Sequence, residues 1–125
     1  MAVICTAEYR DGFMYFPAKG SEDTKDDLIH YGRYIFESCV RQHCKKILLD
    51  HTELKSSMSM GDLYALVQDL ISKNILSISP VTACLIKPDQ VERHEQFEVL
   101  ATNRFLKVKL FTDYQQAVDW LKQTA

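Results

Sequence analysis

The stretch LLDHTELKSSMSMGDLYAL (residues 48–66) decides the fold, because it joins a buried strand to an amphipathic helix through a polar loop that contains methionines. Its first residues belong to the apolar run KILLD, which predicts a strand over residues 46–50 that is covered on both faces or lies deep in a parallel sheet. The helix is predicted from apolar residues at three- and four-residue spacing, namely Leu63, Leu66, Val67, Leu70 and Ile71. Such a strand and helix form the repeating unit of an α/β domain.

The residues before this stretch predict a β-hairpin and then a helix. Apolar and polar residues alternate over residues 3–9, Asp11-Gly12 is a strong signal for a two-residue turn, and FMYF (residues 13–16) predicts a returning strand that Pro17 helps to end. Thr24 and Asp27 predict the N-terminal cap of a helix that extends to about residue 43. Its expected apolar face consists of Leu28, Ile29, Gly32, Ile35, Phe36, Cys39 and Val40.

The residues after it predict two more strand and helix pairs. VTACLI (residues 81–86) reads as a buried strand, residues 89–104 as a helix, and LKVKLF (residues 106–111) as a strand whose Lys107 and Lys109 face solvent at a sheet edge or exposed face. A capping box from Thr112 to Gln115 should start the terminal helix. Its expected buried residues are Tyr114, Ala117, Val118 and Leu121.

The predicted order is therefore ββαβαβαβα, a hairpin followed by three strand and helix units. Right-handed crossovers between the later strands imply a mixed, mainly parallel sheet covered by helices. A chain of 125 residues with 46% hydrophobic residues can bury one core, so we expect a single domain over residues 1–125.

Charge and hydropathy argue against a nucleic-acid partner and against membrane insertion. The chain has 15 Lys+Arg and 17 Asp+Glu, a formal net charge of -2, and no basic block, so we expect no nucleic-acid partner. No apolar stretch approaches the roughly 18 residues of a membrane span, and the opening MAVICTAEYRDG does not read as a signal peptide. We therefore expect a cytoplasmic protein without membrane insertion.

Catalytic and metal-binding patterns are weak. The four histidines accompany no G-x-S-x-G elbow, and the glycines stand singly rather than in a phosphate-binding loop, so neither an enzyme nor a cofactor is expected. Cys39, His43 and Cys44 could supply metal ligands, but no CxxC or HxxxH pair completes a site. We interpret all four cysteines as reduced thiols that act as small core residues, and we predict no metal site.

Two polar residues at the end of the strand predicted over residues 46–50 need an interpretation. Asp50 and the later LIKP could be compared with phosphoacceptor receiver domains, but the order of elements differs and the acidic pair that follows the first strand of a receiver is missing. We expect Asp50 to turn the chain by accepting backbone hydrogen bonds. His51 should lie at the carboxyl end of a strand, where open α/β sheets bind ligands, so an enzyme site near Asp50 and His51 is an alternative.

The whole layout resembles the STAS superfamily, the anti-sigma-factor antagonist or SpoIIAA-like fold. FTDYQQAVDWL (residues 111–121) is similar to the tail of bacterial STAS-like proteins, in which a strand that ends in Phe leads into a helix with Ala followed by Trp-Leu. The resemblance covers nearly the whole chain. It implies a regulatory protein that binds a protein partner and has no enzymatic activity.

The resemblance also directs attention to Ser59. Anti-sigma-factor antagonists are phosphorylated on the serine of an Asp-Ser-[Ser/Thr]-Gly motif, and with Asp50 matched to the aspartate that ends the preceding strand, MSMG (residues 58–61) falls on that motif. Ser59 then takes the phosphoserine position and Gly61 the glycine position, whereas Met58 and Met60 replace the aspartate and the hydroxyl residue. The alternative role of Ser59 is a helix N-cap. The interaction loop that this reading predicts consists of Asp50, His51, Ser56, Ser57, Met58, Ser59, Met60 and Gly61.

Two further possibilities stay open. The SpoIIAA-like fold also resembles the lipid-carrying CRAL-TRIO domain, so a small-molecule or lipid carrier with a pocket at the carboxyl end of the sheet is an alternative function. Its aromatic lining would come from Tyr31, Tyr34, Phe36 and Tyr64. The half-polar first strand and the number of aromatic residues also predict a homodimer.

Overall fold

The computed structural model describes residues 3–22, 24–56, 81–91 and 107–124. The described elements are β1 (Val3–Cys5), β2 (Glu8–Arg10), β3 (Phe13–Glu22), α1 (Lys25–Gln42), β4 (Lys46–Ser56), β5 (Val81–Leu85), a short 3₁₀ helix (Pro88–Gln90), β6 (Val108–Phe111) and α4 (Tyr114–Gln123). The helix predicted over residues 62–71 lies outside the described residues, and of the helix predicted over residues 89–104 only residues 89–91 are described. None of the described helices is long and apolar enough to cross a membrane.

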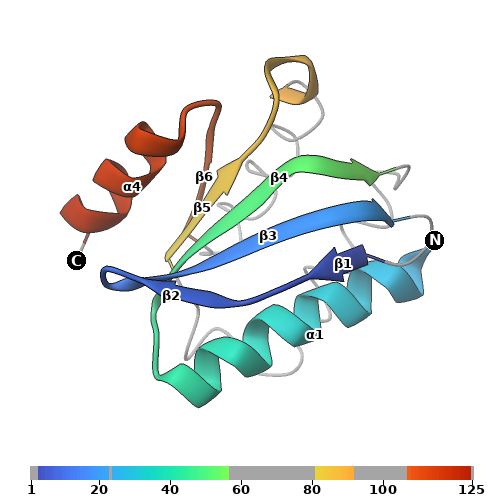
Figure 1. Cartoon of the computed structure of the whole chain (residues 1–125), viewed down its shortest axis with the longest axis horizontal. Helices are drawn as coiled ribbons and strands as arrows, with labels where there is room; N and C mark the ends of the chain where they lie inside the picture. Colours follow the sequence, from blue (N-terminus) through green and yellow to red (C-terminus); the bar gives the residue numbers. More distant parts are fainter. Residues whose placement is uncertain (1–2, 23, 57–80, 92–106, 125) are drawn as a thin grey trace.

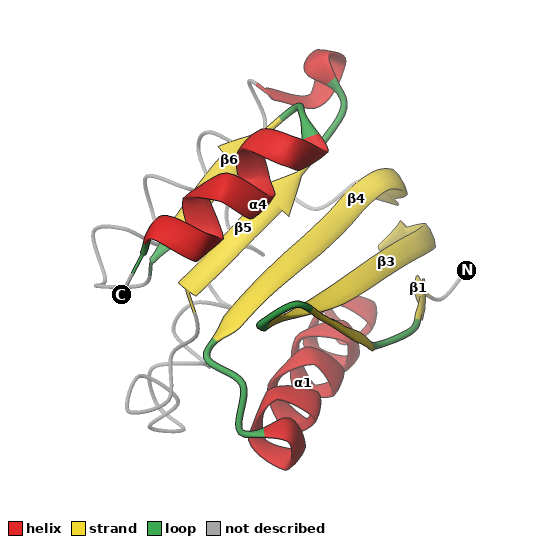
Figure 2. Ribbon diagram, turned by 60° about the vertical axis from the view of Figure 1, so that its left-hand side comes forward, coloured by secondary structure: helices red, strands yellow, loops and turns green. Residues whose placement is uncertain are grey.

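The strands form one mixed sheet in the order β1-β3-β4-β5-β6, with β2 paired to β3 (Figure 1). β1 and β2 run antiparallel to β3, whereas β3, β4, β5 and β6 are mutually parallel. α1 packs on one face of the sheet and α4 on the other, as Figure 2 shows. The predicted α/β class, the mainly parallel sheet and the place of residues 108–111 at a sheet edge are therefore confirmed.

The hairpin turn is the one predicted, but both strands around it differ from the prediction. Asp11 and Gly12 have φ values of 38° and 93°, the left-handed conformation that a two-residue turn needs. The opening strand is interrupted at Thr6 and Ala7, yet β1 and β2 keep one register along β3. The interruption faces Pro17, which accepts a hydrogen bond from the Thr6 N–H at 3.4 Å but has no N–H to return.

The prediction that Pro17 helps to end the second strand is wrong, because β3 continues to Glu22. The loss of one N–H costs a single ladder hydrogen bond, and an irregularity in the pairing with β4 follows directly after Pro17. β4 is also longer than predicted and extends to Ser56 instead of ending at Asp50. The extra residues of β4 pair with the extra residues of β3, so each extension supports the other.

Alternate residues of the central strands fill two cores. Leu48 is fully buried on the α4 face and Phe16 is fully buried on the α1 face, each with 0% exposure. The α4-face core is formed by Phe13, Leu48, Val81, Ala83, Leu85, Ala117, Val118 and Leu121. The α1-face core is formed by Met14, Phe16, Ala18, Tyr31, Ile35, Cys39, Ile47 and Leu54.

The helices differ in detail from their predicted faces. Along α1, Val40 is 44% exposed, while Tyr31 and Ser38, which the prediction left out, are buried. In α4 the N-cap is Asp113 instead of Thr112, since the Asp113 carboxylate accepts a hydrogen bond from the Gln116 N–H at 2.9 Å. The helix begins at Tyr114, whose side chain is 39% exposed rather than buried, whereas Ala117, Val118 and Leu121 are buried as predicted.

The capping box predicted at Thr24 is present. The Thr24 hydroxyl accepts a hydrogen bond from the Asp27 N–H at 3.1 Å, and the Thr24 N–H donates to the Asp27 carboxylate at 3.2 Å. We expect Thr24→Ala to lower the free energy of unfolding by about 1 kcal/mol, because the Asp27 N–H loses its acceptor. Urea denaturation measures the change, and Thr24→Ser, which keeps the hydroxyl, should stay within a few tenths of wild type. Equal losses in the two variants would contradict this role.

Candidate functional site

The predicted interaction loop divides between a strand and residues that the structure leaves undescribed. Asp50, His51 and Ser56 all belong to β4, so the expectation that Asp50 ends this strand and that His51 follows it is wrong. Ser57, Met58, Ser59, Met60 and Gly61 lie outside the described residues. The described part of the site is therefore centred on the middle of β4.

A β-bulge shapes β4 at this point. Pro17 pairs with Asp50 and Lys19 with Glu53, so β4 uses one residue more than β3 over the same step. The Asp50 carboxylate Oδ1 accepts hydrogen bonds from the Thr52 N–H at 3.1 Å and from the Thr52 hydroxyl at 2.7 Å. Asp50 thus accepts a backbone hydrogen bond two residues ahead, as predicted, but the result is a bulge within a strand rather than a turn.

Asp50 is held on the α4 face by a tyrosine from the neighbouring strand. The Tyr15 hydroxyl donates to Asp50 Oδ2 at 2.5 Å. Burial acts to raise the pKa of the Asp50 carboxyl group, but the hydrogen bonds from Tyr15 and Thr52, and the nearby His51, lower this pKa below its usual value. Burial and the hydrogen bond to Asp50 raise the pKa of Tyr15. The pair therefore consists of a carboxylate and a neutral phenol at neutral pH.

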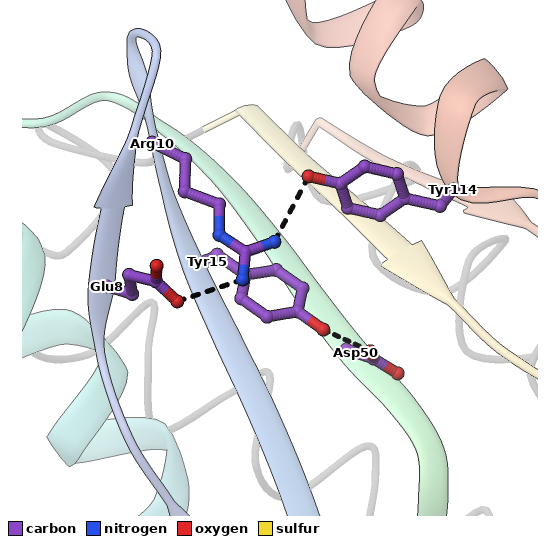
Figure 3. Close-up of polar contacts among 5 residues, drawn as sticks. All are labelled: Glu8, Arg10, Tyr15, Asp50 and Tyr114. Atoms are coloured by element: carbon purple, nitrogen blue, oxygen red, sulfur yellow. Dashed lines mark hydrogen bonds and ion pairs between the residues drawn. The ribbon is translucent and has the colours of Figure 1, made fainter.

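An arginine completes this cluster, as Figure 3 shows. The Arg10 guanidinium lies 3.9 Å from the centre of the Tyr15 ring, and it donates hydrogen bonds to Glu8 at 2.9 Å and to the Tyr114 hydroxyl at 3.2 Å. The Tyr15 and Tyr114 rings also meet edge to face, with their centroids 6.1 Å apart. The cluster joins the hairpin, β4 and the first turn of α4, which are far apart in the sequence.

His51 belongs to a second cluster on the α1 face. Its Nε2 lies 2.6 Å from the Tyr31 hydroxyl, and its Nδ1 lies 3.4 Å from the Cys84 sulfur. Tyr31 comes from α1 and Cys84 from β5, and both side chains are buried. The sequence pointed to Tyr31 only as a pocket residue and to Cys84 only as a core thiol. Their contacts with His51 depend on the packing of α1 against the sheet for Tyr31 and on the pairing of β5 with β4 for Cys84.

The two candidate catalytic residues do not form a joint site. Asp50 contacts Tyr15 on the α4 face, whereas His51 contacts Tyr31 on the α1 face, so the sheet separates the two side chains. An enzyme that used both on one substrate would need them on one face.

The structure places all four cysteines and bears on the possible metal site. None of the four cysteines forms a disulfide; Cys39 and Cys84 are buried, and Cys5 and Cys44 are half-buried. Burial raises the pKa of the Cys39 thiol to about 12, which disfavours the thiolate that a metal would need. Within the described part of the chain, no group of three His, Cys, Asp or Glu side chains could hold a metal ion.

The aromatic residues proposed for a carrier pocket are only partly placed. Tyr31 is buried beside His51, Tyr34 and Phe36 are half-buried on α1, and Tyr64 lies outside the described residues. A hollow of about 140 Å³ lies elsewhere, between β2, β3 and the end of α1. It is lined by Ala7, Tyr9, Met14, Ser38, Arg41 and Gln42.

Comparison with known proteins gives structural matches alone. No protein-family model and no curated protein sequence matches the chain. An uncharacterised protein of the DUF3478 family with a SpoIIAA-like fold, from Shewanella loihica PV-4, is 22% identical; the match covers 96% of this chain and 93% of that protein, with a TM-score of 0.58. An anti-sigma factor antagonist from Mycobacterium paratuberculosis is 12% identical; the match covers 98% of this chain and 96% of that protein, with a TM-score of 0.63. The chain therefore has the SpoIIAA-like (STAS) fold.

Proposed function

We propose that this chain is a non-enzymatic, cytoplasmic regulatory module that binds a protein partner through the residues after β4, with Ser59 as a phosphorylation site. The observation that carries the proposal is the structural similarity to an anti-sigma factor antagonist over 98% of this chain. Phosphorylation would add a charge of about −1.5 to −2 beside two methionines that can offer adaptable apolar contact to a partner. Binding would then depend on the charge at Ser59.

The clusters around β4 support a role of this kind over catalysis. Asp50 accepts hydrogen bonds at both carboxylate oxygens, and the ring nitrogens of His51 each have a neighbour within hydrogen-bond distance. Such contacts hold β4 in position and leave neither side chain aimed at a shared substrate. β4 can then serve as a rigid support for residues 57–61, which follow it directly in the sequence.

A charge-mimic experiment tests the proposal. Ser59→Asp is expected to weaken binding to the protein partner at least about tenfold, because a carboxylate replaces a neutral hydroxyl at the contact. Partners are captured with the wild-type chain from extracts of its own organism, identified, and titrated by calorimetry against purified variants. Ser59→Ala controls for loss of the hydroxyl, and Ser57→Asp places the same charge two residues away. A folded Ser59→Asp variant that binds every partner as wild type does would refute the switch.

The alternative functions give different results with the same protein. Native mass spectrometry of the chain isolated from its own organism would show a copurified ligand if it were a carrier, and peptide mapping of residues 55–73 would show phosphate on Ser59 if it were a switch. An enzyme that depended on the site near Asp50 and His51 would lose turnover in His51→Ala.

A further inference from the structure

The hairpin edge of the sheet differs from the opposite edge in the side chains that it presents. β6 forms one edge and carries exposed Lys109, with exposed Lys107 just before it, and edge lysines discourage pairing with another strand. β2 lies at the other edge, where Tyr9 is 62% exposed. No described residue pairs with the outer side of β2. The β2 edge is therefore the edge suited to receive another strand.

The geometry of the hairpin defines which backbone groups face outward. Arg10 and Phe13 flank the two-residue turn and are cross-strand partners, and in such a hairpin the flanking residues exchange both hydrogen bonds. Hydrogen-bonded and non-hydrogen-bonded residue pairs alternate along an antiparallel pair of strands. The next pair, Tyr9 and Met14, is therefore not hydrogen-bonded, and Tyr9 directs its N–H and C=O away from β3. Tyr9 thus offers one donor and one acceptor at the outer side of β2.

The side chains of β2 complement a second copy of the same strand. If two β2 strands pair antiparallel about a two-fold axis with Tyr9 opposite Tyr9, Glu8 of each copy lies opposite Arg10 of the other. Glu8 and Arg10 already lie on one face of the hairpin, 2.9 Å apart, so their charges are presented side by side. The two-fold arrangement therefore creates two charge pairs between copies instead of two repulsions.

A hollow lies next to this edge on the face of Tyr9. It has a volume of about 140 Å³ and is lined in part by Tyr9 and Met14 from the hairpin and by Ser38 and Arg41 from α1. Directly opposed residues of an antiparallel pair point to the same face, so the second Tyr9 ring would emerge beside the hollow. Val40, 44% exposed, lies close by in sequence on the same end of α1 and would add apolar area.

We infer that two copies of this chain associate through β2, with antiparallel pairing centred on Tyr9, reciprocal contacts between Glu8 and Arg10, and Tyr9 against the hollow. The paired edge is short, so the dimer is weak and reversible. It goes beyond the proposed function and does not depend on it, because residues 57–61 and the β2 edge belong to different parts of the chain.

Charge complementation between two variants tests this dimer. Glu8→Arg and Arg10→Glu should each raise the apparent dissociation constant about tenfold or more, because each places like charges opposite one another at both symmetric contacts. An equimolar mixture should recover the wild-type dissociation constant, since arginine of one variant then lies opposite glutamate of the other. Within each variant chain, residues 8 and 10 carry like charges both alone and in the mixture. Recovery of the wild-type dissociation constant therefore reports contacts between chains. Sedimentation velocity from micromolar to submillimolar concentration gives the constants.

Two further variants keep the result interpretable. Lys109→Glu changes a charge at the opposite edge and should leave the dissociation constant at its wild-type value. Tyr9→Asp opposes two carboxylates at the centre of the contact and should prevent association, while circular dichroism checks that each variant is folded. A wild-type chain that stays monomeric, single variants that dimerise as wild type does, or a mixture that fails to recover would each overturn the proposal. A change in Ser59-dependent partner binding would leave it standing.

Discussion

Phe16→Ala is expected to lower the free energy of unfolding by about 3–5 kcal/mol. Phe16 is fully buried on β3, between the antiparallel strands on one side and β4 on the other, and its ring meets Tyr34 of α1 edge to face with centroids 6.2 Å apart. Truncation would remove one of the contacts between α1 and the sheet and would leave a cavity that the rigid strands cannot fill. Urea denaturation followed by the fluorescence of Trp120, the single tryptophan, measures the loss.

A second phenylalanine provides the matched control. Phe36 lies on α1 and is half-buried, so Phe36→Ala removes the same number of atoms from a site that water already reaches. We expect less than half of the loss found for Phe16→Ala. Equal losses would show that the α1-face core does not depend on Phe16 in the way its burial indicates.

Local patterns predicted the elements whose signal lies within a few neighbouring residues. Five consecutive buried residues make β5 readable as an apolar run, and the Asp11-Gly12 turn needs no context beyond its own backbone. The length of β4 was missed because residues 51–56 are mostly polar. Exposed Glu53, buried Leu54 and exposed Lys55 do alternate, however, and this period of two is the signal of a strand covered on one face.

Pro17 misled the prediction for a different reason. A proline was expected to help end its strand, yet in the fold its missing N–H falls opposite Thr6, at a break between β1 and β2. Whether a proline ends a strand depends on the partner across the ladder. That partner is known only once the register is known.

The candidate site was the least predictable part, because its contacts join distant residues. Arg10 meets Tyr114, and Tyr31 meets His51, only after α4 and α1 have packed on opposite faces of the sheet. The sequence did single out Asp50 and His51 as polar residues that follow an apolar run. The sequence could not show that Asp50 and His51 point to opposite faces of the sheet. The predicted strand ended at Asp50, and the alternation of faces applies only to residues within a strand.

Asp50→Ala is expected to lower the free energy of unfolding by about 1–3 kcal/mol at neutral pH. The Tyr15 hydroxyl and the Thr52 N–H would each lose a charged acceptor in a partly buried position. Half of the effect or more should depend on Tyr15, so the same substitution in a Tyr15→Phe background should cost less. This double-mutant cycle separates the Tyr15 contact from the bulge contacts of Thr52.

The stability provided by Asp50 should also depend on pH in a defined direction. Its pKa is lowered in the folded chain from the usual 3.8, so folding favours the charged form. The difference in free energy of unfolding between wild type and Asp50→Ala should therefore be fully present above pH 3.8. It should shrink as the pH falls through the folded pKa. Urea denaturation of both proteins at a series of pH values between neutrality and the acid limit of folding measures this difference.

The pH dependence of the difference in free energy of unfolding between wild type and Asp50→Ala distinguishes two explanations for the conformation of β4. If the carboxylate holds the bulge, acid should remove the advantage of wild type over Asp50→Ala while Thr24→Ala keeps its own small deficit, because the Thr24 hydroxyl does not titrate. If packing of Leu54 and Leu49 alone holds the bulge, the gap between wild type and Asp50→Ala should stay constant with pH. A constant gap would leave the Tyr15 contact with Asp50 without a stabilising role, and the cluster around Arg10 would then be held by the hydrogen bonds of Arg10 and by its contact with the Tyr15 ring.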